Sequence, residues 1–123
     1  MIKNIIFIGL GGGIGSILRY LSQRLADKVY PTHFPLGTYL VNILGCFLIG
    51  LFWGFTFKGF ETNEHWKLFL MTGICGGFTT FSSFSLEGIG LLREQKMALF
   101  FIYLGTSVIV GLIATYAGMK ISH

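Results

Sequence analysis

Four long apolar segments, joined by short polar connections, constrain the fold of this chain more than any other feature. They extend over about Ile5–Leu25, Leu36–Phe57, Trp66–Leu92 and Met97–Met119. Each is long enough to cross a bilayer as a helix, which takes about 20 residues. The chain is 53% hydrophobic and 11% charged, and a soluble domain of 123 residues cannot bury so much apolar surface. We therefore expect one all-α membrane domain, residues 1–123, with four transmembrane helices.

The third segment contains a stretch that fits poorly into a continuous helix. Gly73–Ser85 reads GICGGFTTFSSFS, in which glycines are weak helix formers and the Ser and Thr hydroxyls can bond to the backbone instead. Irregular backbone within a membrane is tolerated only where protein buries it or where it lines a wet cavity. Phe78, Phe81 and Phe84 then share one face of the resumed helix. The pattern favours a helix broken at mid-membrane that forms an ion or substrate site, with a glycine-rich packing patch as the alternative.

The other three segments carry isolated polar side chains. A charge inside a membrane span usually faces protein or water, so Arg19 attracts anions or fixes a neighbouring turn, unless it snorkels from the helix end. Asn42, with Thr38 one turn before it, offers two amide donors to a neighbouring helix or to a permeant anion. The fourth segment carries hydroxyl groups along one stripe, at Tyr103, Ser107 and Thr115.

The first segment also carries the glycine-rich run GLGGGIGS. It lacks the third glycine of a dinucleotide-binding fingerprint, and no strand precedes it. The pairs Gly9/Gly13 and Gly11/Gly15 have the spacing that lets membrane helices approach closely, which is the use we expect.

Positive charges are balanced between the two ends of the segments. One end has Lys3, Lys58, Lys67 and Lys120, and the other has Arg24, Lys28, Arg93 and Lys96. The positive-inside rule therefore gives no preferred orientation, which favours a dual-topology, antiparallel homodimer. The net charge of the chain is +4. We expect the basic side chains to interact with lipid headgroups and not with nucleic acid. Cys46 and Cys75 fall within apolar segments and are expected to be small buried hydrophobes, not a disulfide or a metal pair.

The stretches GGGIGSILRY, GTYLVNILGCFLIG and GICGGFTTFSSFS, at these spacings within four short spans, resemble the fluoride channel family known as Fluc or CrcB. The resemblance covers essentially the whole chain. It implies a dual-topology homodimer in the bacterial plasma (inner) membrane, with two antiparallel pores that let fluoride leave the cytoplasm passively and so lower its toxicity. It also implies a structural sodium ion at the centre of the dimer.

Carried over by motif position, the resemblance assigns roles to individual residues. The fluoride pore would be lined by Phe81, Phe84, Asn42, Tyr103, Ser107, Thr115 and Thr38. The backbone carbonyls of Gly76 and Thr79 would hold the sodium ion, one pair from each protomer. Arg19 corresponds to the arginine that ends the motif GxGxxxR. Gly111 departs from the pattern, because some members have a further hydroxyl there.

These residue types suit a small, tightly hydrated anion. Amide and hydroxyl donors can replace its water without a fixed positive charge that would trap it. A phenyl ring has a positive edge, so Phe81 and Phe84 can meet an anion edge-on while narrowing the path against larger halides.

The main alternative is a small proton-coupled exporter of cations or drugs. Such a transporter needs a titratable carboxylate at mid-membrane, and Glu87 lies near a segment end. A structural membrane subunit would explain the glycines but not the Phe face together with the hydroxyls. We expect no enzymatic activity, because Ser82 and Ser83 have no plausible His or Lys base on a neighbouring span.

Overall fold

The computed structural model describes residues 1–29, 34–57 and 67–122, and these residues are almost entirely helical. The elements are α1 (Ile2–Val29), α2 (Leu36–Phe57), the π-helix η1 (Leu68–Cys75), α4 (Gly76–Phe78), α5 (Phe81–Arg93) and α6 (Met97–Ser122). Within these described ranges, four stretches are long and apolar enough to cross a membrane: α1, α2, the third segment from η1 to α5, and α6. The predicted all-α fold with four spanning segments is confirmed.

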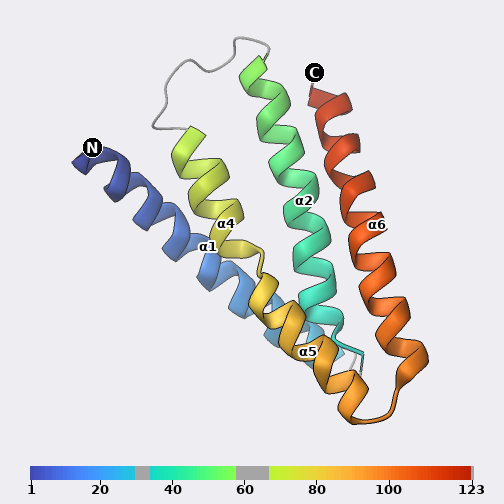
Figure 1. The fold of residues 1–123 in the computed structure, drawn as a ribbon. Coiled ribbons are helices and arrows are strands. Elements are labelled where there is room, and N and C mark those ends of the chain that lie inside the picture. The colour runs from blue at the N-terminus through green and yellow to red at the C-terminus, as the bar shows by residue number, and fades with distance from the viewer. Residues whose placement is uncertain (30–33, 58–66, 123) are drawn as a thin grey trace.

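The four segments alternate in direction, so both chain termini lie at the same end of the molecule (Figure 1). α2 and α6 lie side by side along most of their length. On the other side, α1 packs against η1 and α4, whereas α5 packs against α6. The third segment therefore begins against α1 and ends against α6, and its change of direction lies between α4 and α5 (Figure 1).

Two glycines let the backbone of α1 touch the third segment. A Cβ at Gly11 would lie 2.9 Å from a backbone atom of η1, and a Cβ at Gly15 would lie 2.8 Å from a backbone nitrogen of α4. Gly9 and Gly13, in contrast, would have no such neighbour within 4 Å of an added Cβ. Among the described residues, Gly11/Gly15 of the two predicted packing pairs is therefore used within the chain, and Gly9/Gly13 is not.

α2 and α6 also meet through glycines. A Cβ at Gly118 would lie 2.8 Å from the Leu51 nitrogen, and one at Gly50 would lie 3.1 Å from the Met119 nitrogen. Near the end of α6, Ser122 Oγ donates to the Gly118 carbonyl at 2.8 Å. This close packing fixes α6 against α2, and so fixes the side chains that the two helices present to the third segment.

Some predicted boundaries were wrong by several residues. α2 has the predicted bounds, but α1 continues to Val29, four residues beyond the predicted end of the first segment at about Leu25. Lys28 lies in the last turn of α1, where a positive charge favours the negative end of the helix dipole, so the charged residues extend the helix. The polar connection between the second and third predicted segments, residues 58–65, lies outside the described residues.

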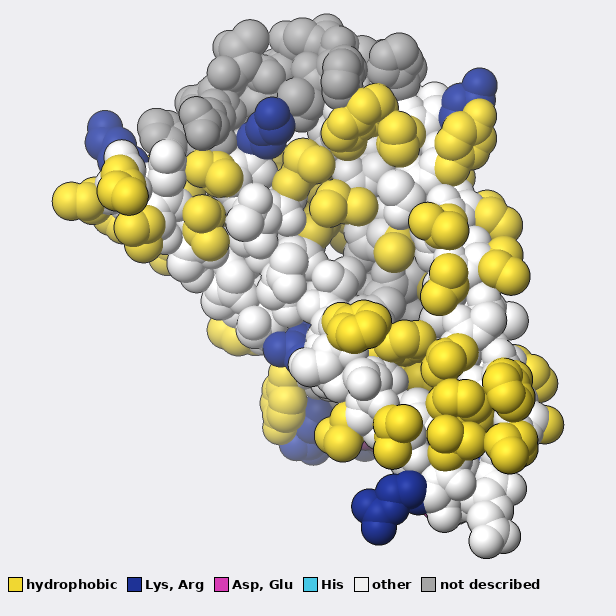
Figure 2. All heavy atoms as spheres, viewed as in Figure 1, with side chains coloured by type: hydrophobic (Ala, Val, Ile, Leu, Met, Phe, Trp, Pro, Cys, Tyr) yellow, Lys and Arg dark blue, Asp and Glu magenta, His cyan; other side chains and the backbone are white. Residues whose placement is uncertain are grey.

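The surface is strongly apolar. Hydrophobic side chains are spread widely over the face shown in Figure 2, and the surface is hollowed between the third segment and the α2–α6 pair. Large side chains such as Ile17, Leu21 and Leu112 are more than half exposed. Such a surface requires lipid or another apolar partner, so the chain is a multi-pass membrane protein.

Candidate functional site

Two residues with extended backbone separate α4 from α5. Thr79 has φ −87° and ψ 158°, and Thr80 has φ −152° and ψ 123°. Thr79 is still hydrogen-bonded to the preceding helical turn. Its N–H and its Oγ1 both donate to the Cys75 carbonyl, at 3.0 and 2.8 Å. The helical hydrogen-bond ladder of the third segment is therefore interrupted after Thr79.

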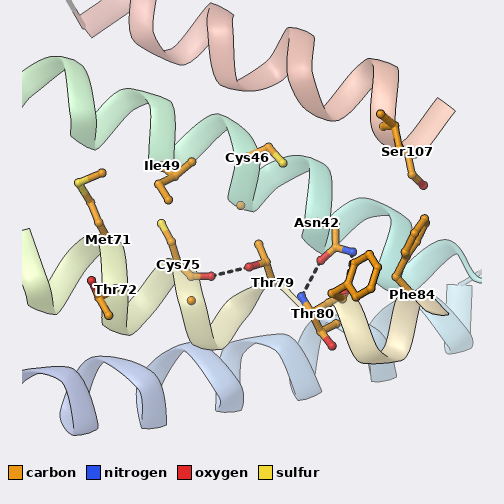
Figure 3. A pocket seen from close by; sticks show the side chains of 14 residues that line it. Asn42, Cys46, Ile49, Met71, Thr72, Cys75, Thr79, Thr80, Phe84 and Ser107 are labelled. Atoms are coloured by element: carbon orange, nitrogen blue, oxygen red, sulfur yellow. Dashed lines mark hydrogen bonds between the residues drawn. The ribbon is translucent and has the colours of Figure 1, made fainter. Parts of the chain in front are cut away.

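The side chain of Asn42 on α2 supplies the hydrogen bonds that Thr80 lacks. Asn42 Nδ2 donates to the Thr80 carbonyl at 3.0 Å, and the Thr80 N–H donates to Asn42 Oδ1 at 2.8 Å (Figure 3). This pair fixes the orientation of the amide, since only the oxygen can face an N–H. One of the two Nδ2 hydrogens remains available for another acceptor.

Thr80 also caps α5. Its Oγ1 accepts from the Ser83 N–H at 3.1 Å, which is the N-cap arrangement expected of a Thr before a helix. The backbone of Thr80 is thus held by α2, and its side chain holds the first turn of α5. The resumed helix, which carries Phe81 and Phe84, takes its position from this one residue.

A cavity of about 590 Å³ lies beside this interruption, between the third segment, α2 and α6 (Figure 3). The predicted site residues that line it are Asn42, Gly76, Thr79, Phe81, Phe84 and Ser107. None of the described residues in its lining is Asp, Glu, His, Lys or Arg. The cavity therefore offers amide, hydroxyl, carbonyl and aromatic groups, without a side chain that carries a formal charge.

Two phenyl rings and one hydroxyl form the end of the cavity nearest α5. The rings of Phe81 and Phe84 have centroids 5.8 Å apart and are tilted by 44°. Phe81 is 79% exposed, so within one chain nothing covers most of its ring. Ser107 Oγ is buried and has no hydrogen-bond partner among the described residues. A buried hydroxyl without a partner is costly, and it marks a place where a ligand can accept a hydrogen bond.

Tyr103 and Thr38 belong to a neighbouring cluster and do not line this cavity. Tyr103 is fully buried, its ring lies 5.1 Å from that of Phe84, and its hydroxyl donates to Glu87 at 3.5 Å. Thr38 also contacts the Glu87 carboxylate and accepts from Gln23 Nε2 at 3.0 Å. This cluster therefore places further polar groups on the far side of Phe84 from the cavity.

Two further predicted residues lie apart from the cavity. The Thr115 carbonyl faces α2 at Gly50, and Thr115 is absent from the lining. Arg19 is partly exposed, and its Nε is buried without a hydrogen-bond partner among the described residues. Neither residue is brought to the Asn42–Thr80 pair within one chain.

The carbonyls of Gly76 and Thr79 have lost their usual helical partners. In a continuous helix the N–H of residue i+4 would bond to each of them. The Thr80 N–H donates to Asn42 instead, and the Ser83 N–H donates to Thr80 Oγ1. Within residues 1–29, 34–57 and 67–122 no group of three or more His, Cys, Asp or Glu side chains could hold a metal ion. These two carbonyls are therefore well suited to a hard cation, which prefers oxygen ligands.

Sequence reasoning did not assign the roles that Thr80, Gln23 and Glu87 have around this site. Thr80 was one hydroxyl among several, and its partner Asn42 lies 38 positions away. No sequence pattern indicated that Thr38 would contact both Gln23 and Glu87. The polar character of Gln23 within an apolar segment was the one signal that would have singled it out.

These features define a class of protein: a small polytopic membrane protein with an uncharged, largely apolar cavity that holds a few polar groups beside an interrupted helix. The chain belongs to the family described as "CrcB-like protein, Camphor Resistance (CrcB)", whose pattern matches residues 6–119. The family resemblance seen in the sequence is thereby confirmed.

Relatives from distant organisms match nearly the whole chain. The "Fluoride-specific ion channel FluC" of Flavobacterium psychrophilum is 48% identical over 120 residues, which cover 98% of this chain and 97% of the relative. The protein of the same name from Azobacteroides pseudotrichonymphae is 42% identical over 118 residues, 96% of this chain and 94% of the relative. That of Pyrococcus horikoshii is 40% identical over 121 residues, 98% and 97% of the two chains.

Proposed function

We propose that this chain is a fluoride-selective ion channel that lets fluoride leave the cytoplasm passively. The observation that carries the proposal is the cavity in which Asn42, Phe81, Phe84 and Ser107 meet. The relatives named as fluoride-specific ion channels match almost the full length of the chain, which supports it.

Fluoride would exchange its water for donors on the cavity wall. Asn42 keeps one N–H free of the Thr80 bond, and Ser107 has a hydroxyl that bonds to no described residue. The edges of Phe81 and Phe84 carry partial positive charge. Since no cationic side chain lines the described wall, the anion is stabilised at each step without being trapped.

The proposed path continues beyond Phe84 to Tyr103 and Thr38. The 5.1 Å ring contact and the shared interaction with Glu87 support this continuation. Thr115 remains a proposed path residue because it lies on the same stripe of α6 as Tyr103 and Ser107. For Arg19 we propose attraction of anions towards the path, supported by its Nε, which has no hydrogen-bond partner in the described part of the chain.

We infer that the interruption at Thr79 and Thr80 is a helix break at mid-membrane. The third spanning segment extends over Leu68–Arg93, so the two extended residues fall near its middle. The Asn42 amide satisfies both backbone groups of Thr80, which makes such a break tolerable in an apolar environment.

We propose that two chains assemble as an antiparallel homodimer. The 79% exposure of Phe81 and the open surface at Gly9 and Gly13 support a partner that covers them. The test is a Lys120→Cys reporter in a Cys46→Ser/Cys75→Ser background, labelled in intact cells with an impermeant maleimide. Dual topology predicts that about half of the copies react before permeabilisation, and labelling of all or none contradicts it.

We propose that the Gly76 and Thr79 carbonyls of both protomers hold a sodium ion at the dimer centre. The loss of their helical donors supports this assignment. When bound, the ion would supply positive charge that the described cavity side chains lack. The dimer is expected to be more resistant to heat in sodium than in an equal concentration of N-methylglucamine, and equal stability in both would argue against the ion.

The experiment that tests the function is passive efflux from proteoliposomes, measured with a fluoride electrode, with valinomycin to carry compensating potassium. Rapid fluoride release, with chloride retained in a parallel trial, is the expected result. Release only under a proton gradient would overturn the channel and point to the proton-coupled exporter, for which Glu87 would be the first residue to change.

A further inference from the structure

Each of the four spanning segments contributes one polar side chain to the cluster beyond Phe84. The members are Gln23 on α1, Thr38 on α2, Glu87 on α5 and Tyr103 on α6. Tyr103 is fully buried and Thr38 is 1% exposed, so their hydroxyls depend on partners within the protein. Gln23 is the member to which neither the sequence motifs nor the proposed path gives a role.

Gln23 reaches α2 by passing over a glycine. A Cβ at Gly37 would lie 3.1 Å from both Cα and Cγ of Gln23, which is too close for comfortable contact. Because Gly37 has no side chain, the two helices approach closely there. The Gln23 amide then extends across the backbone of α2 and its Nε2 donates to Thr38 Oγ1 at 3.0 Å. The packing of α1 on α2 therefore places this amide.

The directions of the hydrogen bonds follow from the groups that make them. A hydroxyl has one hydrogen to donate, and an ionised carboxylate can only accept. Thr38 bonds to Glu87, so its hydrogen goes to the carboxylate while its oxygen accepts from the Gln23 N–H. Tyr103 donates its own hydrogen to Glu87 at 3.5 Å. The carboxylate is thus held from two sides, by α2 and by α6.

Gln23 decides where the Thr38 hydrogen points. A threonine near the start of a helix can also bond to the backbone of its own helix. The Gln23 N–H occupies one lone pair of Thr38 Oγ1, and this fixes the rotation of the hydroxyl. With Gln23 in place, the hydrogen is directed to Glu87.

We propose that Gln23 is a positioning residue for fluoride conduction: it orients the Thr38 hydroxyl so that Glu87 stays bonded to α2 and clear of the anion. The inference rests on the proposed function, which takes the path past Tyr103. A carboxylate that turned towards that path would repel fluoride. Asp27, on the next turn of α1, is close enough to repel the same carboxylate, so the two hydroxyl donors are needed to hold it.

Single-channel recording in planar bilayers measures this role. A loss of stability lowers the number of active channels, whereas the current through one channel reports only molecules that have folded and assembled. Gln23→Met keeps the length of the side chain but loses the N–H, and it should lower the single-channel fluoride current more than about twofold. Gln23→Glu would accept the Thr38 hydrogen and so take it from Glu87, and it should lower the current at least as far.

Ser22→Ala is the matched control. Ser22 is a polar residue of the same turn of α1, but it lines a separate cavity whose other described side chains are apolar. The variant should carry the wild-type current.

The Glu87→Gln background separates positioning from packing. Glutamine has the shape of glutamate without its charge, so Gln23 no longer has a carboxylate to hold away from the anion. Gln23→Met should therefore cause no further loss of current in that background. A further loss as large as in the wild type would overturn the proposal, because Gln23 would then act by packing alone.

The hydrogen bond itself is tested without conduction. The chain has two glutamines, Gln23 and Gln95, so selective labelling with nitrogen-15 gives two pairs of side-chain amide signals in the NMR spectrum of the detergent-solubilised protein. Thr38→Val should shift the Gln23 pair and speed its exchange with solvent. The signals of Gln95, which is exposed, should stay as they are and serve as the internal control. Unchanged Gln23 signals would overturn the bond on which the proposal depends.

The two measurements distinguish this inference from the proposed function. A wild type that carries no fluoride current would contradict the channel, even if the labelled amide shows the bond to Thr38. A wild type that conducts fluoride, with the same single-channel current in Gln23→Met, would contradict the positioning role alone.

Discussion

The Asn42 side chain bonds to both backbone groups of Thr80, as a neighbouring strand would. The two hydrogen bonds, at 3.0 and 2.8 Å, satisfy the N–H and the carbonyl of Thr80. Thr80 has extended backbone and lies where the third segment is not helical. Asn42 therefore connects the geometry of the interruption to the cavity wall, because the same amide keeps a free N–H.

Asn42→Asp should lower fluoride flux by more than about tenfold and lower the free energy of unfolding by about 1–3 kcal/mol. The carboxylate can still accept from the Thr80 N–H, but it cannot donate to the Thr80 carbonyl and places negative charge beside an anion path. Liposome efflux and thermal unfolding in detergent measure the two effects.

Asn4→Asp, near the start of α1, is the matched control for the same chemical change. It should leave both quantities close to those of the wild type. Full activity in Asn42→Asp would reduce Asn42 to a packing residue.

Replacing Thr80 tests the cap of α5. Thr80→Val keeps the β-branched shape but removes the Oγ1 that accepts from the Ser83 N–H, which should cost about 0.5–2 kcal/mol. Faster amide hydrogen exchange in the first turn of α5 should accompany the loss. Thr80→Ser retains the acceptor and should behave like the wild type, and equal exchange in both variants would exclude the cap as a source of order.

Ser107→Ala separates the function of a hydroxyl from its structural role. Because Ser107 Oγ is buried without a partner among the described residues, its removal should leave the stability unchanged or slightly increased. Fluoride flux should nevertheless fall, since a donor to the anion is lost. Thr106→Val, which removes a hydroxyl bonded to the Ile102 carbonyl of its own helix, should not reduce flux. Unaltered flux in Ser107→Ala would take Ser107 off the path.

Phe81→Ile should abolish fluoride flux, or reduce it more than about tenfold, while the dimer still assembles. The branched aliphatic side chain retains bulk but has no positive ring edge to meet the anion. Phe101→Ile, on an exposed aromatic ring of α6 outside the cavity lining, is the control. Efflux and size-exclusion chromatography together distinguish loss of conduction from loss of assembly. Normal flux through Phe81→Ile would remove this ring from the pore.

Gly15→Ala should destabilise the fold by about 1–3 kcal/mol, because its methyl group would overlap the backbone of η1 and α4. Gly13→Ala adds the same methyl group where no described residue outside the adjoining part of α1 has an atom within 4 Å. Both variants gain the same helix propensity from Gly→Ala, so the difference between their unfolding temperatures reports the steric overlap alone. Equal destabilisation would mean that α1 does not pack as described.

The helices were predictable because hydropathy acts over whole segments. Leu36–Phe57 was predicted at its observed bounds, since an apolar run between prolines and polar residues has clear limits. Asp27 and Lys28 fell outside the first predicted segment, although α1 includes them, because charge marks the membrane boundary and not the end of the helix. The π-helix η1 was not foreseen, because one residue of extra spacing in the backbone bonds leaves no clear trace in an all-apolar sequence.

The site was predictable in its residue types and less so in its connections. The glycines and hydroxyls of the third segment indicated the interruption, and the Phe spacing indicated the rings. The bond from Asn42 to Thr80 joins two helices, so no local pattern specifies it. The same holds for the Gln23–Thr38 bond, which joins α1 to α2.

The position of the chain ends has a consequence for gene fusion. Both termini lie at one end of the helices, because four spans alternate in direction (Figure 1). Two copies in the same orientation can therefore be joined by a simple hydrophilic tether. In the proposed antiparallel pair, the end of one copy and the start of the other lie on opposite sides of the bilayer. A single-chain version of that pair needs an odd number of additional membrane-crossing helices between its halves.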